Sequence, residues 1–392
     1  MTPRPQVDAV LREAVESGEV PGVVAMAATD RGVLYEGAFG RRALGQPEPM
    51  TLDSVFRIAS MTKAITSVAA MQLVEQGKLA LEAPVPDIDP TLGSPQVLEG
   101  FDAAGKPRLR PARRPITLRH LLTHTAGFGY DMWDPTVGRY LETAGLPARG
   151  GGHVASIRLP LVFDPGERWE YGINTAWVGR LVEAASGRPL DAYFRERIFG
   201  PLGMADSGYV TTTEQRGRQA RLHQRQADGS LRLQPLEPPA TAAEFWSGGG
   251  PLYSTGRDYL RLLQMLLHRG SWDGARLLRS ETVALMGENH TGDLSAGVMK
   301  TARPEMSDDV DFFPGARIRW GLGYMLNLDP GPNGRSAGTV SWGGIFNTYY
   351  WLDPVRRVAG LIMTQILPFA DPRVLGLYGR FERAVYDALR TG

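Results

Sequence analysis

Ser60 and Lys63 are the residues whose types and spacing best suit nucleophilic chemistry. Apolar residues follow them at helical spacing, so both are expected on one face at the start of a helix. A lysine can serve as a base for serine when burial or a nearby cation lowers its pKa. The free N–H groups of a helix start also favour an oxyanion. The alternative is a serine N-cap followed by a surface lysine.

Further blocks along the chain support the catalytic interpretation. Ser-x-x-Lys is the nucleophile motif of β-lactamases and penicillin-binding proteins. The blocks that resemble segments of this superfamily are 56–63 (FRIASMTK), 121–127 (LLTHTAG), 165–171 (PGERWEY), 247–255 (SGGGPLYST) and 341–344 (SWGG). Their order and spacing extend from roughly residue 10 to residue 380. The chain therefore resembles the family VIII carboxylesterases, the esterase relatives of class C β-lactamases.

This resemblance implies a role for each matched position. Ser60 is expected to be the nucleophile, with Lys63 and Tyr171 as a coupled base system, in which Tyr171 takes the proton from Ser60. The expected oxyanion hole consists of the backbone N–H groups of Ser60 and Ile345. The expected substrate-binding residues are Tyr130, Trp342, Gly343 and Gly344. The resemblance also predicts an α/β (α+β) fold of the β-lactamase/transpeptidase type.

Two departures from the class C pattern favour esters over β-lactams. The class C tyrosine motif is Tyr-x-Asn, whereas Ile173 stands two places after Tyr171 and Asn174 comes one place late. The third motif of β-lactamases begins with a cation, which would pair the substrate carboxylate, but Trp342 occupies that position. We therefore expect a carboxylesterase that acts on small neutral esters.

Three other functions remain open on the same sequence. A β-lactamase or D-alanyl-D-alanine carboxypeptidase would share the scaffold and the nucleophile. An acyltransferase would differ only in the acceptor, since an alcohol replaces water. A catalytically inactive binding protein is disfavoured by the intact set of Ser60, Lys63 and Tyr171.

Metal and cofactor chemistry find no support in the sequence. The chain has no cysteine, and its six histidines show no spacing typical of metal ligands. His124 could act as a general base, but the resemblance of its block, 121–127, to the superfamily favours a structural role. There is no Gly-x-Ser-x-Gly motif, so an α/β-hydrolase is disfavoured. We expect an enzyme without cofactor or metal.

The elements that must position these residues follow from hydrophobic periodicity. Segments 23–27 and 33–35 flank a turn at Asp30–Gly32 and predict a hairpin. Further strands are expected in 321–326, 337–341, 349–352 and 358–365, with helices over 257–268 and 374–389. Strands at both ends predict one antiparallel sheet flanked by helices, with an inserted, mainly helical lobe. The predicted domains are 1–78 with 255–392, and 79–254. Within the lobe, 95–115 is expected to be an exposed excursion, and 215–239 is expected to be irregular.

Composition restricts the partners and the location. The chain has 392 residues, a net charge of +1 and 22 % charged residues, so it lacks the basic excess of a nucleic-acid-binding protein. No window of about 18 apolar residues exists, so no membrane association is expected. No apolar leader segment follows Met1, which predicts a cytoplasmic protein.

Overall fold

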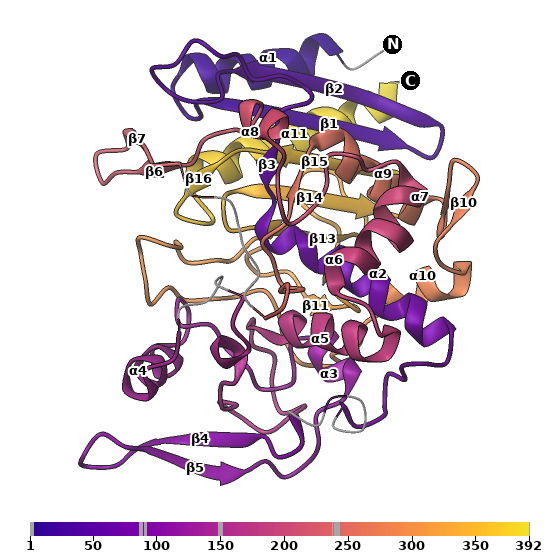
Figure 1. The fold of residues 1–392 in the computed structure, drawn as a ribbon. Coiled ribbons are helices and arrows are strands. Elements are labelled where there is room, and N and C mark those ends of the chain that lie inside the picture. The colour runs from indigo at the N-terminus through magenta and orange to yellow at the C-terminus, as the bar shows by residue number, and fades with distance from the viewer. Residues whose placement is uncertain are drawn as a thin grey trace.

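A seven-stranded antiparallel sheet forms the centre of the molecule (Figure 1). The computed structural model describes residues 4–85, 89, 92–147, 152–236, 238 and 244–391. Across the sheet the strand order is β11-β12-β13-β14-β15-β1-β2. The strands are β1 (Gly22–Thr29), β2 (Gly32–Gly40), β11 (Ile318–Trp320), β12 (Met325–Asn327), β13 (Val340–Gly344), β14 (Thr348–Asp353) and β15 (Val358–Met363). Because β1 pairs with β15, the sheet joins both ends of the chain, as the strand pattern predicted.

Helices cover both faces of this sheet. Helices α1 (Arg4–Glu16) and α11 (Pro372–Thr391) contact each other, and the ring of Phe381 on α11 packs against that of Tyr35 on β2. Helix α9 (Gly256–Leu267) lies on β1 and β15, where Gly256 meets the side chains of Val24 and Met26. Tyr35 pairs with Ala27, and neighbouring residues of a strand point to opposite faces, so α9 and α11 lie on opposite sides.

The middle of the chain adds helices and short strands. The longer helices are α2 (Thr62–Glu75), α4 (Pro135–Ala144) and α5 (Asn174–Ser186). The shorter ones are α3 (Leu118–Leu122), α6 (Leu190–Phe194), α7 (Gly200–Leu202), α8 (Thr213–Gly217) and α10 (Ser280–Met286), with single turns η1 (Ala59–Met61), η4 (Val154–Ile157) and η5 (Arg195–Phe199). The short strands are β3 (Phe56–Arg57), β4 (Gln96–Phe101), β5 (Pro107–Pro111), β6 (His223–Arg225), β7 (Leu231–Leu233), β8 (Tyr253–Ser254), β9 (Ser271–Trp272), β10 (Ala275–Arg276) and β16 (Ile366–Leu367).

Two segments of the lobe contain regular structure that the sequence did not indicate. The segment expected to be an exposed excursion holds the β4–β5 hairpin, which projects from the helical part in Figure 1. Its turn forms because Asp102 accepts the backbone N–H groups of Ala104 and Lys106, while Gly105 adopts a φ of 80°. The second holds α8 and the β6–β7 hairpin. Polar and proline-rich composition hid both hairpins. The division at residues 78 and 254 stays a prediction.

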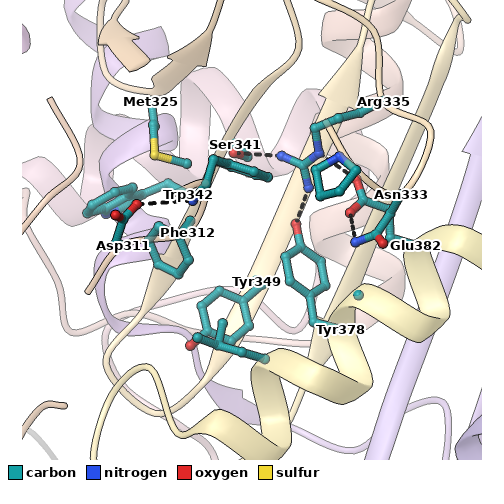
Figure 2. A pocket seen from close by; sticks show the side chains of 14 residues that line it. Asp311, Phe312, Met325, Asn333, Arg335, Ser341, Trp342, Tyr349, Tyr378 and Glu382 are labelled. Atoms are coloured by element: carbon teal, nitrogen blue, oxygen red, sulfur yellow. Dashed lines mark hydrogen bonds and ion pairs between the residues drawn. The ribbon is translucent and has the colours of Figure 1, made fainter. Parts of the chain in front are cut away.

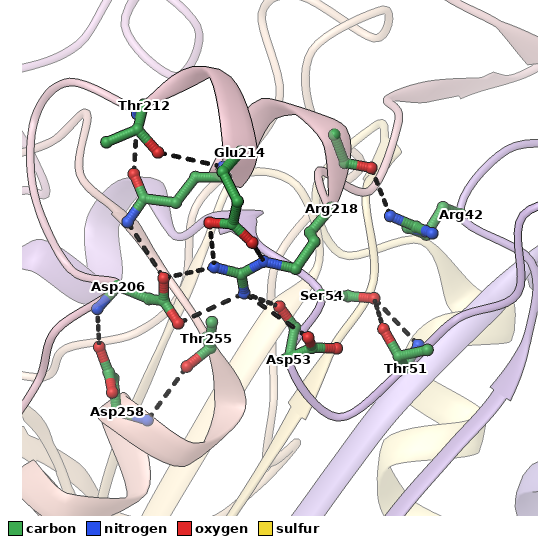
Figure 3. A network of polar contacts seen from close by, with 12 residues as sticks. Arg42, Thr51, Asp53, Ser54, Asp206, Thr212, Glu214, Arg218, Thr255 and Asp258 are labelled. Carbon is green, nitrogen blue, oxygen red and sulfur yellow. Dashed lines mark hydrogen bonds and ion pairs between the residues drawn. The ribbon is translucent and has the colours of Figure 1, made fainter.

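A polar network fixes the segment before the nucleophile (Figure 3). Arg218 binds the carboxylates of Asp206 and Glu214 and the backbone carbonyl of Asp53, which precedes β3. The backbone N–H of Asp206 donates to Asp258 on α9 at 2.8 Å. Burial raises the pKa of Asp258 to about 6. The network thus ties β3, α8 and α9 together close to the chain that delivers Ser60.

Candidate active site

Ser60 lies in η1, the turn between β3 and α2. The turn is anchored by a bond of 2.9 Å from the Ile58 N–H to the carbonyl of Leu252. Ala59, directly before the serine, has a φ of 44°, an uncommon conformation for a residue with a side chain. The chain thus turns sharply at the serine. As predicted, Ser60 and Lys63 lie together at a helix start.

The Lys63 side chain is buried, with only 1 % of its surface exposed. Its Nζ donates to Ser60 Oγ at 3.1 Å, to the Gly249 carbonyl at 3.0 Å and to Tyr130 Oη at 3.4 Å. Three acceptors match the three N–H donors of an ammonium group. The Nζ also lies 4.9 Å from the centre of the Tyr171 ring. The Lys63 amino group is therefore held between the serine and two tyrosines.

Tyr171 is buried beside the nucleophile. Its hydroxyl accepts a hydrogen bond of 2.9 Å from the indole N–H of Trp342 and interacts with the Ser60 hydroxyl. Burial raises the pKa of Tyr171 well above its usual value, and Tyr130 adds to this effect. The bonds from Ser60 and Trp342 act in the opposite direction, because they stabilise a phenolate. The resting residue is thus a phenol, with two donors ready to stabilise its anion.

His124 supports Tyr171 from behind. The Nδ1 atom of this buried histidine accepts the backbone N–H of Gly172 at 3.3 Å and the side-chain amide of Asn174 at 3.0 Å. Burial and the charge of Lys63 lower the pKa of His124 well below its usual value, so the ring is neutral. The ring centre lies 4.6 Å from that of Tyr171. Its contacts are those of a structural residue, and Asn174 is turned toward it.

Two glycines bring β13 against the nucleophile turn. A Cβ on Gly344 would collide with the carbonyl of Ile58, and one on Gly343 would collide with the ring of Tyr349. Only glycine permits this approach of the strand to η1. Ile345 follows directly and lines the cleft beside Ser60. Ser60 and Ile345, whose backbone N–H groups are the predicted oxyanion donors, thus line the same space.

A second glycine block closes the site from the side of α5. The carbonyl of Gly248 accepts the hydroxyl of Thr66 on α2 at 2.6 Å. A Cβ on Gly248 would lie 2.6 Å from the carbonyl of Thr175. This tight passage between α2 and α5 aims the Gly249 carbonyl at Lys63.

A cleft opens in front of these groups and brings most of the predicted residues together. The predicted residues that line it are Ser60, Tyr130, Tyr171, Trp342, Gly343 and Ile345. Lys63 lies beneath the serine, whereas Gly344 contacts the main chain of Ile58 instead. Further apolar walls are supplied by Met132, Trp133, Pro251, Phe346 and Phe369.

A second chamber adjoins the cleft on the side of the helical part. Tyr130, Gly249, Gly250 and Pro251 border both spaces. The second chamber is also lined by Ile157, Ile173, Ala176, Phe245 and Trp246. Ile173, which stands where class C enzymes carry asparagine, thus contributes an apolar wall.

A cavity of about 260 Å³ lies behind Trp342 (Figure 2). Phe312 stands between the two spaces, with its ring centre 6.0 Å from Trp342 and 6.0 Å from Phe369. At the polar end of the cavity, Arg335 binds Glu382, Ser341 and Tyr378. The wall of the cleft at Trp342 is therefore a single aromatic layer.

Sequence reasoning missed one cation in the cleft. Arg57, on β3, lines the space and places its guanidinium 4.3 Å from the centre of the Phe346 ring. Its position three residues before Ser60, on a short strand that leads into the nucleophile turn, was the available signal. The position of Trp342 carries no cation, but the cleft as a whole does.

Neither a metal centre nor a membrane-spanning helix is found in the part of the chain that the structure describes. No three histidine, aspartate or glutamate side chains there are grouped so as to hold a metal ion. No described helix is long and apolar enough to cross a membrane.

Comparison with known proteins identifies the family. A family model described as beta-lactamase matches residues 7–384. The chain belongs to the beta-lactamase family. The superfamily that the sequence motifs indicated is thus confirmed, whereas the narrower assignment to family VIII stays a prediction.

The similar members of this family are acyl-transferring and ester-cleaving enzymes. The chain is 34 % identical to monacolin J acid methylbutanoyltransferase from Aspergillus terreus, over 98 % of this chain and 96 % of the relative. It is 31 % identical to the lovastatin esterase of Penicillium rubens, over 97 % and 98 %.

Solved structures agree on the fold. Unliganded simvastatin synthase from Aspergillus terreus superposes with a TM-score of 0.85, at 32 % identity over the whole of both chains. EstCE1, a hydrolase with promiscuous acyltransferase activity, gives a TM-score of 0.77 at 23 % identity, over 98 % of each chain. The predicted β-lactamase/transpeptidase-like fold is thus confirmed.

Proposed function

We propose that this protein is a carboxylesterase that takes the acyl group of a neutral ester onto Ser60 and delivers it to water. The observation that carries the proposal is the buried contact of Lys63 Nζ with Ser60 Oγ at 3.1 Å, beside Tyr171 in an apolar cleft. A serine hydroxyl activated by adjacent groups attacks carbonyl carbon. Family VIII of the carboxylesterases remains the assignment that we favour.

Both halves of the reaction use the same groups. The reactive form of Tyr171 is its phenolate, formed when the phenol releases its proton to solvent. Ser60 Oγ forms a bond to the ester carbonyl carbon while its proton passes to this phenolate. The tetrahedral oxyanion is held by the N–H groups of Ser60 and Ile345. It collapses when the alcohol leaves with the proton from Tyr171, which becomes a phenolate again. Water then attacks the acyl-enzyme and gives a proton to Tyr171, which passes it to Ser60 Oγ as the acid is released.

The charge of Lys63 makes this proton route feasible. A phenolate at Tyr171 would be costly in a buried site. The ammonium of Lys63, 4.9 Å from the ring centre, and the indole N–H of Trp342 both stabilise it. Desolvation by a bound ester would strengthen these interactions, because the local dielectric falls.

The walls of the cleft favour uncharged acyl and alcohol groups. Ile173, Trp133 and Phe369 offer apolar surface on both sides of the nucleophile. Trp342 cannot pair with a substrate carboxylate. Arg57 is the group that a carboxylate in this cleft would meet. An acidic function is therefore best tolerated on the Arg57 side.

Transfer to an alcohol is the second candidate. It is favoured by the name of the relative from Aspergillus terreus, a methylbutanoyltransferase at 34 % identity. The chemistry up to the acyl-enzyme is identical, and an alcohol in the apolar cleft would replace water. The geometry of Ser60, Lys63 and Tyr171 suits both acceptors.

The test is a panel of p-nitrophenyl esters of increasing acyl length, run beside nitrocefin, with and without an added alcohol. We expect kcat/KM for the best ester to exceed that for nitrocefin by more than about tenfold, since a missing charge-assisted bond is worth roughly 1.5–3 kcal/mol. Equal turnover of nitrocefin would make the protein a β-lactamase instead. Esters of the added alcohol as the main product would establish transfer.

A further inference from the structure

Glu170 directly precedes Tyr171 in an extended segment that is fixed to the His124 block. Its backbone N–H donates to the carbonyl of His124 at 2.9 Å. Gly172, on the other side of the tyrosine, donates to the ring of the same histidine. A displacement of the Glu170 side chain therefore acts on the segment that carries Tyr171.

Asp134 belongs to the segment that carries Tyr130 and Trp133, two residues that line the cleft. It caps α4, because its Oδ1 accepts the backbone N–H of Thr136 at 2.7 Å. Its own N–H donates to the carbonyl of Tyr130 at 2.8 Å. Trp133 directly precedes Asp134, and its ring centre is 5.5 Å from that of Tyr171. Asp134 is thus fixed to the segment that carries two cleft residues.

The side chains of Glu170 and Asp134 meet beside Gly129, where a Cβ would lie 2.6 Å from Glu170 Oε1 and 3.6 Å from Asp134 Cβ. The Glu170 Oε2 binds Arg168 at 3.0 Å, whereas Oε1 is buried without a hydrogen-bond donor. Two facing carboxyls with one unsatisfied oxygen are stable when they share a proton.

We propose that Glu170 is a positioning residue: a proton shared with Asp134 holds the segment of Tyr171 against the segment of Tyr130 and Trp133. The charged groups that face the Glu170 carboxyl are Asp134, at the start of α4, and Arg168, in its own loop. On the segment of Asp134, Asp131 is paired with Arg303 at 3.0 Å and does not take this role.

Loss of this proton would push the two walls of the cleft apart. Burial and the charge of Asp134 raise the pKa of Glu170 to about 7, against the pull of Arg168. Above that pH, two carboxylates oppose each other. Tyr130 and Trp133 would then be held less closely to Tyr171, so ester binding would weaken as pH rises. The Glu170 carboxyl itself touches no reacting atom.

Two isosteric substitutions separate the shared proton from the packing. Glu170→Gln keeps the shape and places an N–H donor toward Asp134 at every pH. Asp134→Asn removes the second carboxyl and preserves the cap of α4, since asparagine caps a helix as well as aspartate. Neither variant alters Ser60, Lys63 or Tyr171, so the ratio of variant to wild type isolates Glu170.

The activity test measures kcat and KM for a neutral p-nitrophenyl ester from pH 5.5 to 9.5, and it rests on the proposed function. For Glu170→Gln, we expect kcat/KM to equal that of wild type below about pH 6 and to be at least about threefold higher than that of wild type at pH 9. The midpoint of this change in the ratio should lie near pH 7, and the change should come from KM. Asp134→Asn should follow the same course. A ratio that stays flat over this range would overturn the proposal.

Unfolding in urea tests the shared proton without reference to activity. Because the folded-state pKa is raised, wild type should lose stability relative to Glu170→Gln as pH rises from about 4.5 to about 7, and then level off. The folding equilibrium constant should change by one to two orders of magnitude, as roughly two pKa units imply. A difference that does not change with pH refutes the shared proton. If Glu170→Gln does not fold, Asp134→Asn supplies the comparison.

Discussion

The hydrogen bond from Trp342 to Tyr171 predicts a loss of activity when its donor is removed. The indole N–H lies 2.9 Å from the phenol oxygen, in a site where both side chains are buried. Trp342→Phe removes this donor and retains an aromatic ring. Tyr171 must be a phenolate to accept the proton of Ser60, so in the reactive form the lost bond is one to a charged group. The resting enzyme, with a neutral phenol, is affected less.

The size of the effect follows from these charges. A hydrogen bond to a charged group contributes about 1.5–3 kcal/mol. With roughly 1.4 kcal/mol for each factor of ten, Trp342→Phe should lower kcat by about 10- to 150-fold. KM should change little, because the donor acts on the enzyme and not on the substrate.

Trp320→Phe is the matched control. The Trp320 ring centre lies 4.7 Å from that of Trp342, and the side chain is fully buried. Its indole N–H has no hydrogen-bond partner in the structure, so the same substitution removes similar packing but no bond to Tyr171. Steady-state kinetics on one neutral ester, with thermal unfolding of each variant, separates the two effects.

Two results would refute this reasoning. One is a Trp342→Phe enzyme with kcat within about twofold of wild type. The other is an equal loss in both variants, which would assign the effect to packing around the cavity behind Trp342 rather than to the bond (Figure 2).

The remaining predictions concern the base, its titration and metals. Lys63→Met and Tyr171→Phe should each lower kcat by about 10²–10⁴, and the double variant by little more; full activity in Tyr171→Phe would require another base. Because burial raises the pKa of Tyr171, the fraction of the tyrosine that is a phenolate should rise with pH through the alkaline range, and kcat should rise with it. The measurement uses Glu170→Gln, which lacks the titration of Glu170, and a fall in its kcat between pH 7 and 9 would contradict the role of the tyrosine. The same raised pKa of Tyr171 predicts a contribution to the free energy of unfolding that is present below the usual tyrosine pKa of about 10 and is lost as pH rises above it. Urea unfolding at several pH values measures this loss. Esterase activity should survive dialysis against a chelator. A loss of activity that added zinc or manganese reverses would show a metal requirement.

The sheet and the nucleophile turn could be predicted because their signals are local. Short runs of apolar residues marked β1, β2, β14 and β15, and the Ser-x-x-Lys spacing marked the helix start. Gly343 and Gly344 could be assigned to the site from their block, and in the structure Gly344 lets β13 approach Ile58. The cytoplasmic location and the domain boundaries stay predictions.

Other features depend on contacts between distant parts of the chain. Nothing local indicates that Trp342 donates to Tyr171, 171 residues away, or that Arg57 stacks on Phe346. The facing carboxyls of Glu170 and Asp134 belong to segments that meet only in the folded protein. The β4–β5 hairpin was missed for a different reason, because most of its side chains are only half-buried or exposed and give no apolar alternation.

Covalent trapping tests the central claim most directly. The wild-type protein is treated with a p-nitrophenyl phosphonate ester, and its intact mass and peptides are measured. We predict one adduct per chain, located on Ser60, and no adduct in Ser60→Ala. An adduct that persists in Ser60→Ala, or that maps to another residue of wild type, would contradict the assignment of Ser60 as the nucleophile.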